Sequence, residues 1–303
     1  MDSIRGDFMQ RNTRIRQFLV VAGAASLMLA TTVAAGAAST KGTYSAVDAK
    51  LVPAAYKSGT IQVATDATYA PDESVNASGT MIGFDVDLIH AVATTLGVKV
   101  NENNVTFDDI IAGIKAGKYV IGNSSFTDTL AREKQVNFVD YFQAGEGVYA
   151  KSSSTLKFTG FKSFCGVTVA VETGTTEQSD ATAASKSCPS GKKVDVIPFP
   201  TQTEANTAVR SGRAQFGFLD SQIADYVVST SKGVFKSVGS AVNVAPYGIA
   251  TPKTTAGSGL AKAIEAAVKT LIANGTYAAI LNKWGVSAGA LPLSKITVNG
   301  ATS

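Results

Sequence analysis

A helix that leads into a strand is predicted by residues 85–100, which read DVDLIHAVATTLGVKV. Apolar side chains recur at helical spacing from Val86 to Leu96, and Gly97 supplies a typical helix stop. A strand then begins at Val98. A helix that returns directly to a strand is the repeating unit of α/β proteins.

The flanking segments continue this order. Residues 60–65 alternate as a strand should, and residues 66–71 read as a loop. Residues 107–116 form a second helix that ends at Gly117, and residues 119–122 form another buried strand. Strands that alternate with helices in this way predict a parallel sheet with crossover helices.

A second unit of similar size follows. Its strands are expected at 167–171, 194–197 and 215–219, and its helices at 175–187, 204–211 and 221–229. A strand at 247–250 and a helix at 260–273 come after this unit, and we expect them to return to the first unit. The crossings would lie at 145–150 and 244–250. The sequence therefore predicts a two-lobed α/β fold in which each lobe is a mainly parallel sheet flanked by helices.

The sequence also predicts domain boundaries and an export signal. The expected boundaries are a signal peptide at 1–37, a linker at 38–58, lobe 1 at 59–147 and 247–287, lobe 2 at 148–246, and a tail at 288–303. Four arginines precede an uncharged run at 17–40 with small residues at 35–38, a pattern typical of a secretory signal peptide. A retained membrane anchor is the alternative, because a run of this length could span a bilayer. We expect the protein outside the cytoplasm, in the periplasm, secreted or at the cell surface.

Composition and charge exclude several classes of protein. Hydrophobic residues make up 45% of the 303 residues, which is too many for a disordered chain. Removal of residues 1–37 takes away four Arg and two Asp, so the net charge falls from +4 to +2. A net charge this small gives no electrostatic basis for nucleic-acid binding.

The chain contains two cysteines, Cys165 and Cys188. In an oxidising compartment an isolated pair is expected to form a disulfide. A metal or redox site would need more ligands or a closer spacing.

The sequence contains no recognisable catalytic motif. The single histidine, His90, lies among core positions of a predicted helix, where we expect it to be partly buried. Zinc, phosphate-loop, dinucleotide and nucleophile-elbow motifs are all missing from the sequence. We therefore expect no enzyme, no cofactor and no metal.

Several motifs resemble those of one known family. Residues 83–88, which read GFDVDL, are similar to the signature of the polar amino-acid-binding proteins of bacterial ABC importers, the family 3 solute-binding proteins. The alternative interpretation is that Asp85 and Asp87 only stabilise the start of a helix, because carboxylates interact favourably with its positive N-terminal end. Further similar stretches are 66–71, 124–132 with Phe138, 174–176, Asp220, 275–277 and 283–285. The resemblance covers about residues 59–285.

A zwitterionic amino acid needs a cation for its carboxylate. Arg132 suits this role, because a guanidinium grips a carboxylate through two hydrogen bonds. Ser125 and Thr127 can add donors, and Thr175 and Thr176 open a helix whose free N–H groups favour an anion. The alternatives are a surface position for Arg132 and helix capping for Ser125 and Thr176.

The same ligand needs an anion for its ammonium. By resemblance Asp220 holds this group, with a helix cap as its alternative role. Tyr69 and Phe107 would sandwich the side chain of the ligand, and core packing is the alternative for Phe107.

Two departures from the family bear on the identity of the ligand. Many relatives continue the first loop with Pro-Phe-Glu, whereas this chain has Asp72 before Glu73. Glu172 stands where many relatives carry a smaller or uncharged residue. If Asp66, Glu73 and Glu172 line the far end of the site, an acidic end favours Arg, Lys or His.

The resemblance implies a monomeric binding protein that closes around its amino acid by hinge motion and docks on an ABC permease driven by an ATPase. A dehydratase on the same fold is one alternative, with Glu172 or Glu73 as the proton donor. A ligand-sensing domain is the other.

Overall fold

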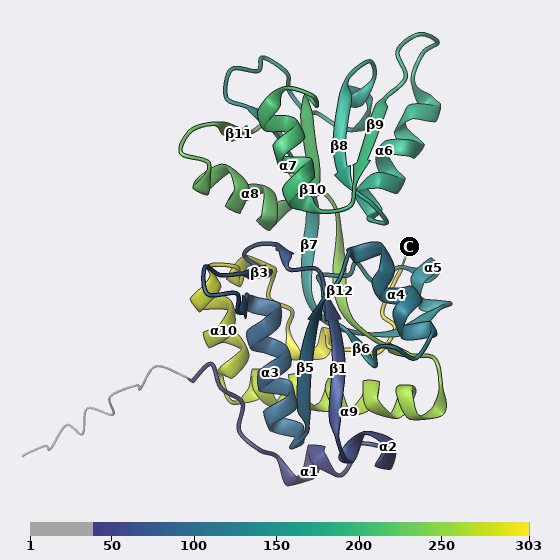
Figure 1. Cartoon of the computed structure of the whole chain (residues 1–303), viewed down its shortest axis with the longest axis vertical. Helices are drawn as coiled ribbons and strands as arrows, with labels where there is room; N and C mark the ends of the chain where they lie inside the picture. The colour runs from purple at the N-terminus through teal and green to yellow at the C-terminus, as the bar shows by residue number, and fades with distance from the viewer. Residues whose placement is uncertain (1–38, 303) are drawn as a thin grey trace, which may run out of the picture. The chain divides into compact units, whose positions relative to one another are not determined.

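The computed structural model describes residues 39–302, so the expected signal peptide lies outside the described residues. Within this part, the strands of the main sheet run in the order β5-β1-β6-β12-β7-β10-β8-β9, and β11 also pairs with β7 (Figure 1). The strand bounds are β1 (Thr60–Thr65), β5 (Lys99–Asn104), β6 (Ile121–Gly122), β7 (Val136–Lys151), β8 (Thr168–Glu172), β9 (Asp195–Phe199), β10 (Phe216–Asp220), β11 (Phe235–Ser237) and β12 (Val242–Pro252). No helix of the described residues is both long and apolar enough to cross a membrane.

The sheet has two halves, each built from parallel strands. In the first half β1 pairs in parallel with β5 and β6, and in the second half β8 pairs in parallel with β9 and β10. The first-half helices are α3 (Phe84–Leu96), α4 (Phe107–Lys115), α9 (Thr255–Ala273) and α10 (Thr276–Trp284). The second-half helices are α6 (Thr176–Ser187), α7 (Gln202–Ser211) and α8 (Ser221–Thr230). The predicted alternation of strands and helices is confirmed, and α3 ends at Gly97 in the left-handed conformation.

Two long antiparallel strands connect the halves. β7 and β12 pair from Val242 opposite Glu146 to Pro252 opposite Val136, and Figure 1 shows both running from one half to the other. The expected crossings at 145–150 and 244–250 fall within these two strands. β7 is buried along nearly its whole length, so it lacks the alternating pattern by which a strand is recognised.

The segments expected to be a linker and a tail both pack on the first half. Residues 38–58 contain α1 (Ala46–Ala49) and α2 (Ala54–Lys57), and the intervening Val52 is only 3% exposed. In the tail, Ile296 is fully buried and the Thr297 carbonyl accepts a hydrogen bond from the Asp140 N–H at 2.9 Å. Neither segment has the periodicity that would reveal this packing in the sequence.

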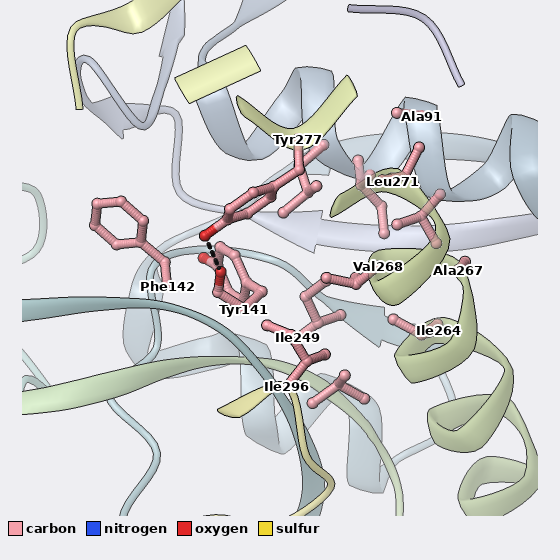
Figure 2. Close-up of a cluster of buried hydrophobic side chains, with 14 of the residues drawn as sticks. Ala91, Tyr141, Phe142, Ile249, Ile264, Ala267, Val268, Leu271, Tyr277 and Ile296 are labelled. Atoms are coloured by element: carbon pink, nitrogen blue, oxygen red, sulfur yellow. Dashed lines mark hydrogen bonds between the residues drawn. The ribbon is translucent and has the colours of Figure 1, made fainter. Parts of the chain in front are cut away.

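The core of the first half packs α9 against the sheet. Figure 2 shows Ile264, Val268 and Leu271 of α9 directed toward the sheet. The Tyr277 hydroxyl donates to the Tyr141 carbonyl at 2.7 Å, which ties α10 to β7. This hydrogen bond satisfies a buried hydroxyl in an otherwise apolar cluster.

The expected disulfide between Cys165 and Cys188 is present, with Cα atoms 5.5 Å apart. Cys165 follows a short 3₁₀ helix (η1, Phe161–Phe164), and Cys188 follows the last residue of α6. The disulfide therefore fastens the far end of α6 within the second half.

Replacement of both cysteines by alanine should lower the free energy of unfolding by about 3 kcal/mol, because the bond closes a loop of 23 residues in the unfolded chain. Urea titration of the variant and of reduced wild-type protein measures this effect, and the two should agree. A loss below about 1 kcal/mol would contradict the prediction.

Candidate functional site

The structure brings all eleven residues expected in the binding site to the lining of one cavity. They are Asp66, Tyr69, Glu73, Phe107, Ser125, Thr127, Arg132, Glu172, Thr175, Thr176 and Asp220. β1, β6, β8 and β10 end here, and the carboxyl end of a parallel sheet is the usual position of a ligand in open α/β folds. The part that each residue plays in binding remains a prediction.

One side of the cavity is cationic. Arg132 lies on α5 (Leu130–Glu133), where it donates to the Thr127 carbonyl at 2.8 Å and to the Gly174 carbonyl at 3.0 Å. Its guanidinium also lies 5.4 Å from the ring centres of Phe107 and Phe126. Burial lowers the pKa of Arg132, although an arginine stays charged at neutral pH.

The guanidinium of Arg132 has no ion-pair partner within residues 39–302, where the ion pairs are those of His90, Lys269 and Lys283. A partly buried cation that binds only neutral carbonyls is available to an external anion. This arrangement suits a ligand carboxylate.

Threonine hydroxyls lie beside the arginine. The Thr127 and Thr176 hydroxyl oxygens are 3.3 Å apart, one from each half. Thr175 caps α6 by accepting from the Gln178 N–H at 3.1 Å, so the helix cap is Thr175 and not Thr176. Ser125, in contrast, caps no helix, because its hydroxyl donates to Asp72 at 2.9 Å.

Carboxyl groups line the rest of the cavity. Asp220 accepts from the Tyr69 hydroxyl at 2.8 Å and makes no side-chain capping bond to α8. Burial raises the pKa of Asp220 to about 7. Glu177 is 2% exposed, and burial together with the charge of Asp220 raises its pKa to about 8. Its Oε1 atom has no hydrogen-bond partner among the described residues.

Asp66 and Glu172 also hold the local backbone in place. Asp66 accepts from the Thr68 hydroxyl at 2.7 Å and from the Phe107 N–H at 3.0 Å. Because Phe107 is the first residue of α4, Asp66 satisfies a backbone N–H group at the start of this helix. Glu172 accepts from the Gln202 N–H at 3.0 Å at the start of α7. Burial raises the pKa of both carboxyl groups, and their mutual proximity raises that of Glu172 further.

Glu73 is fully buried and accepts from the Ser124 hydroxyl at 2.8 Å. It follows a turn that packs closely on the start of α3, where Gly83 has φ +153° and a Cβ atom would lie 1.9 Å from the Asp72 carbonyl oxygen. A side chain at position 83 would therefore displace the loop that carries Asp72 and Glu73.

The aromatic residues have two roles each. Phe107 stacks on Phe126 with ring centres 4.4 Å apart, so it packs in the core as well as lining the cavity. The Tyr69 hydroxyl accepts from the Asp220 N–H at 3.1 Å in addition to donating to its carboxylate. Tyr69 therefore joins the two halves.

Sequence reasoning missed two lining residues, Ser124 and Glu177. Ser124 belongs to the quoted segment 124–132, so its signal was available. Glu177 follows Thr176 in the first turn of α6, where an acidic residue is usual in any helix.

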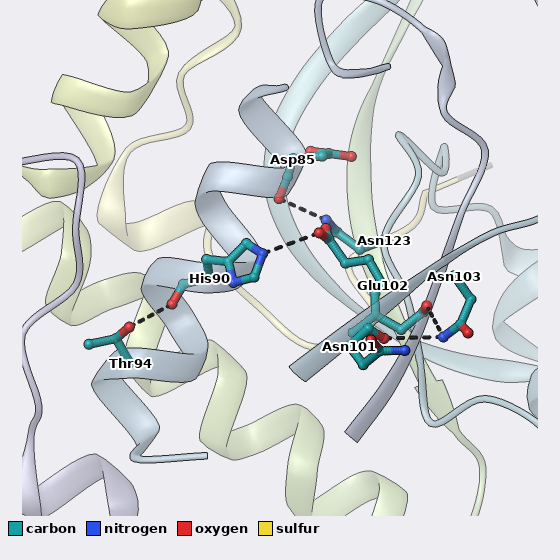
Figure 3. Close-up of polar contacts among 8 residues, drawn as sticks. Asp85, His90, Thr94, Asn101, Glu102, Asn103 and Asn123 are labelled. Carbon is teal, nitrogen blue, oxygen red and sulfur yellow. Dashed lines mark hydrogen bonds and ion pairs between the residues drawn. The ribbon is translucent and has the colours of Figure 1, made fainter. Parts of the chain in front are cut away.

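His90 is exposed and lies 3.2 Å from Glu102, contrary to the expected partial burial (Figure 3). It does not line the cavity. The described residues contain no group of three or more His, Cys, Asp or Glu side chains arranged to hold a metal ion.

The chain is similar to several known amino-acid-binding proteins. The arginine-binding protein ArgT of Corynebacterium glutamicum is 30% identical over 248 residues, which cover 81% of this chain and 80% of that protein. The structure of an ancestral arginine-binding protein bound to arginine is 32% identical, with a TM-score of 0.69 over 75% of this chain and 99% of that one.

A third match is the structure of the ancestral amino acid-binding protein AncCDT-1, described as a precursor of cyclohexadienyl dehydratase. It is 32% identical, with a TM-score of 0.67 over 75% of this chain and 95% of that one. Residues 61–287 match the profile of the bacterial extracellular solute-binding proteins, family 3. This protein belongs to the bacterial extracellular solute-binding proteins, family 3.

Proposed function

We propose that this protein is the extracytoplasmic substrate-binding protein of an ABC importer and that it binds a cationic L-amino acid in the cavity. The observation that carries the proposal is the guanidinium of Arg132, which has no ion-pair partner in the described part of the chain and shares a cavity with the carboxyl groups of Asp220 and Glu177. A ligand with a carboxylate and an ammonium group matches both.

The balance of charge favours a second positive group on the ligand. Five carboxyl residues line the cavity against the single guanidinium of Arg132, and they are Asp66, Glu73, Glu172, Glu177 and Asp220. A cationic side chain would compensate buried carboxylates that lack a counter-ion. Several of the similar proteins are named as arginine-binding proteins, which supports a ligand with a cationic side chain.

We further infer that the halves of the sheet act as two lobes, residues 59–147 with 247–287 and residues 148–246, that close by bending at β7 and β12. The contacts of Tyr69 with Asp220 and of Thr127 with Thr176 would then form on closure. The partners would be a permease and its ATPase, and the protein would act as a monomer.

Calorimetric titration tests the proposal on protein that has been unfolded and refolded to remove carried-over ligand. Arginine, lysine and histidine should bind more tightly than glutamine, and glutamate should not bind. Tight binding of glutamine alone would contradict the cationic preference. No binding of any amino acid would contradict the proposed function.

The acidic end of the cavity makes a separate prediction. Asp66→Asn and Glu172→Gln should each weaken arginine binding more than glutamine binding, because only arginine brings a charge to that end. Asp195→Asn, at an exposed position on β9, is the control. Equal losses for the two ligands would show that both carboxyl groups serve the fold alone.

The dehydratase alternative is tested in the same samples. Incubation with prephenate and arogenate should give no product, and turnover that is lost in Glu172→Gln or Glu73→Gln would overturn the assignment as a binding protein.

A further inference from the structure

Asp72 forms a contact between the two halves that lies outside the cavity. Its carboxyl group is fully buried, and one oxygen accepts from the Ser125 hydroxyl and from the side-chain amide of Gln222, each at 2.9 Å. Asp72 and Ser125 belong to the first half, whereas Gln222 is the second residue of α8 in the second half.

The side-chain amide of Gln222 makes a second contact, with Tyr247 of β12. Its nitrogen also donates to the Tyr247 hydroxyl at 2.7 Å. The contacts of Asp72 therefore join Ser125, which lines the cavity, to Gln222, which lies two residues after the N-cap Asp220 at the start of α8.

Asp72 and Gln222 lie outside the wall of the cavity. Asp72, Gln222 and Tyr247 are absent from the lining, and Gln222 borders a separate groove together with Gln143. The other side-chain contacts between the halves described above each involve a lining residue, and they are Tyr69 with Asp220, Thr127 with Thr176 and Arg132 with the Gly174 carbonyl. The Asp72–Gln222 contact can thus be changed without touching the ligand.

We propose that Asp72 and Gln222 form a latch that favours closure of the two halves without contacting the ligand. This inference rests on the proposed function for its effect on affinity. If the binding-competent closed form is less populated, the apparent affinity for every ligand falls by the same factor. The latch therefore sets affinity but not specificity.

The test compares Gln222→Met, which removes both donated hydrogen bonds at similar volume, with Gln143→Met, the same change in the same groove away from Asp72. Asp72→Asn is the conservative variant, because its amide oxygen can still accept from Gln222. If Gln222→Met fails to fold, Gln222→Ala replaces it. Thermal unfolding verifies that every variant is folded.

The first readout needs no ligand. Small-angle X-ray scattering of ligand-free protein should show a larger radius of gyration for Gln222→Met than for wild type, Gln143→Met and Asp72→Asn. An unchanged radius of gyration in Gln222→Met would overturn the latch. This result stands even if no amino acid binds and the proposed function fails.

The second readout is calorimetric affinity for arginine and glutamine. Gln222→Met should weaken both ligands by the same factor, roughly 5- to 50-fold for the loss of two hydrogen bonds, while Asp72→Asn stays within about two-fold of wild type. A loss confined to one ligand, or wild-type affinity for both, would contradict the latch.

Discussion

Arg132→Ala should weaken amino-acid binding by about 2–5 kcal/mol, or roughly 30- to 5,000-fold. The guanidinium faces the cavity from α5 and has no ion-pair partner among residues 39–302. Its removal would leave a ligand carboxylate without a cation in a closed site. The loss should therefore appear for cationic and neutral amino acids alike, because both carry the same carboxylate.

Two further variants give this prediction its controls. Arg132→Lys keeps the charge but loses the paired donors, so an intermediate loss is expected. Arg213→Ala removes an arginine that lies over the Phe199 ring, 5.1 Å from its centre, and that does not line the cavity, so binding should be unchanged. Calorimetry measures all three. Near-wild-type affinity in folded Arg132→Ala would refute the role assigned to this residue.

The regular elements of the fold could be predicted because their signals are local. Residues 60–65 form β1 as predicted, although burial alternates only as far as Val63 because Ala64 and Thr65 are buried too. The helix that was expected over 85–96 is α3. The short strands β2 (Thr68–Tyr69), β3 (Glu73–Val75) and β4 (Met81–Ile82) were not expected. Strands of two or three residues are too short for any period to be recognised.

The packing of the chain ends could not be predicted, because it depends on distant partners. Asp48 accepts from the Thr270 hydroxyl of α9 at 2.7 Å, and Asn299 accepts from the Phe138 N–H at 2.8 Å. Each contact joins residues more than 160 positions apart. A polar segment that makes such contacts reads as a linker or tail in the sequence alone.

The lining of the cavity was predicted well because its residues lie in short motifs at strand ends. The roles are harder to predict, as Asp85 shows. Helix-start chemistry is one expected role for Asp85, and it does lie in the first turn of α3. In addition it accepts from the Ser125 N–H at 2.9 Å and the Tyr141 hydroxyl at 2.8 Å, and these partners come from other elements.

Affinity for a cationic amino acid should fall by roughly 50-fold between pH 7 and pH 5. Burial raises the pKa of Asp220 to about 7 and that of Glu177 to about 8. Below pH 7 the free protein holds a proton on Asp220, whereas a bound ammonium requires the ionised carboxylate. Binding must then displace one proton, which costs a factor of ten per pH unit. Above pH 8 both groups are ionised and the affinity should level off.

Calorimetric titration with arginine at pH 5, 6, 7 and 8, repeated in buffers of different ionisation enthalpy, measures both the affinity and the number of protons released. Asp220→Asn should lower the affinity at pH 8 and flatten its pH dependence, because the displaced proton is gone. Glu177→Gln should keep the dependence between pH 5 and pH 7, because the displaced proton belongs to Asp220. A pH-independent affinity between pH 5 and pH 8, without proton release, would mean that Asp220 does not receive the positive charge of the ligand.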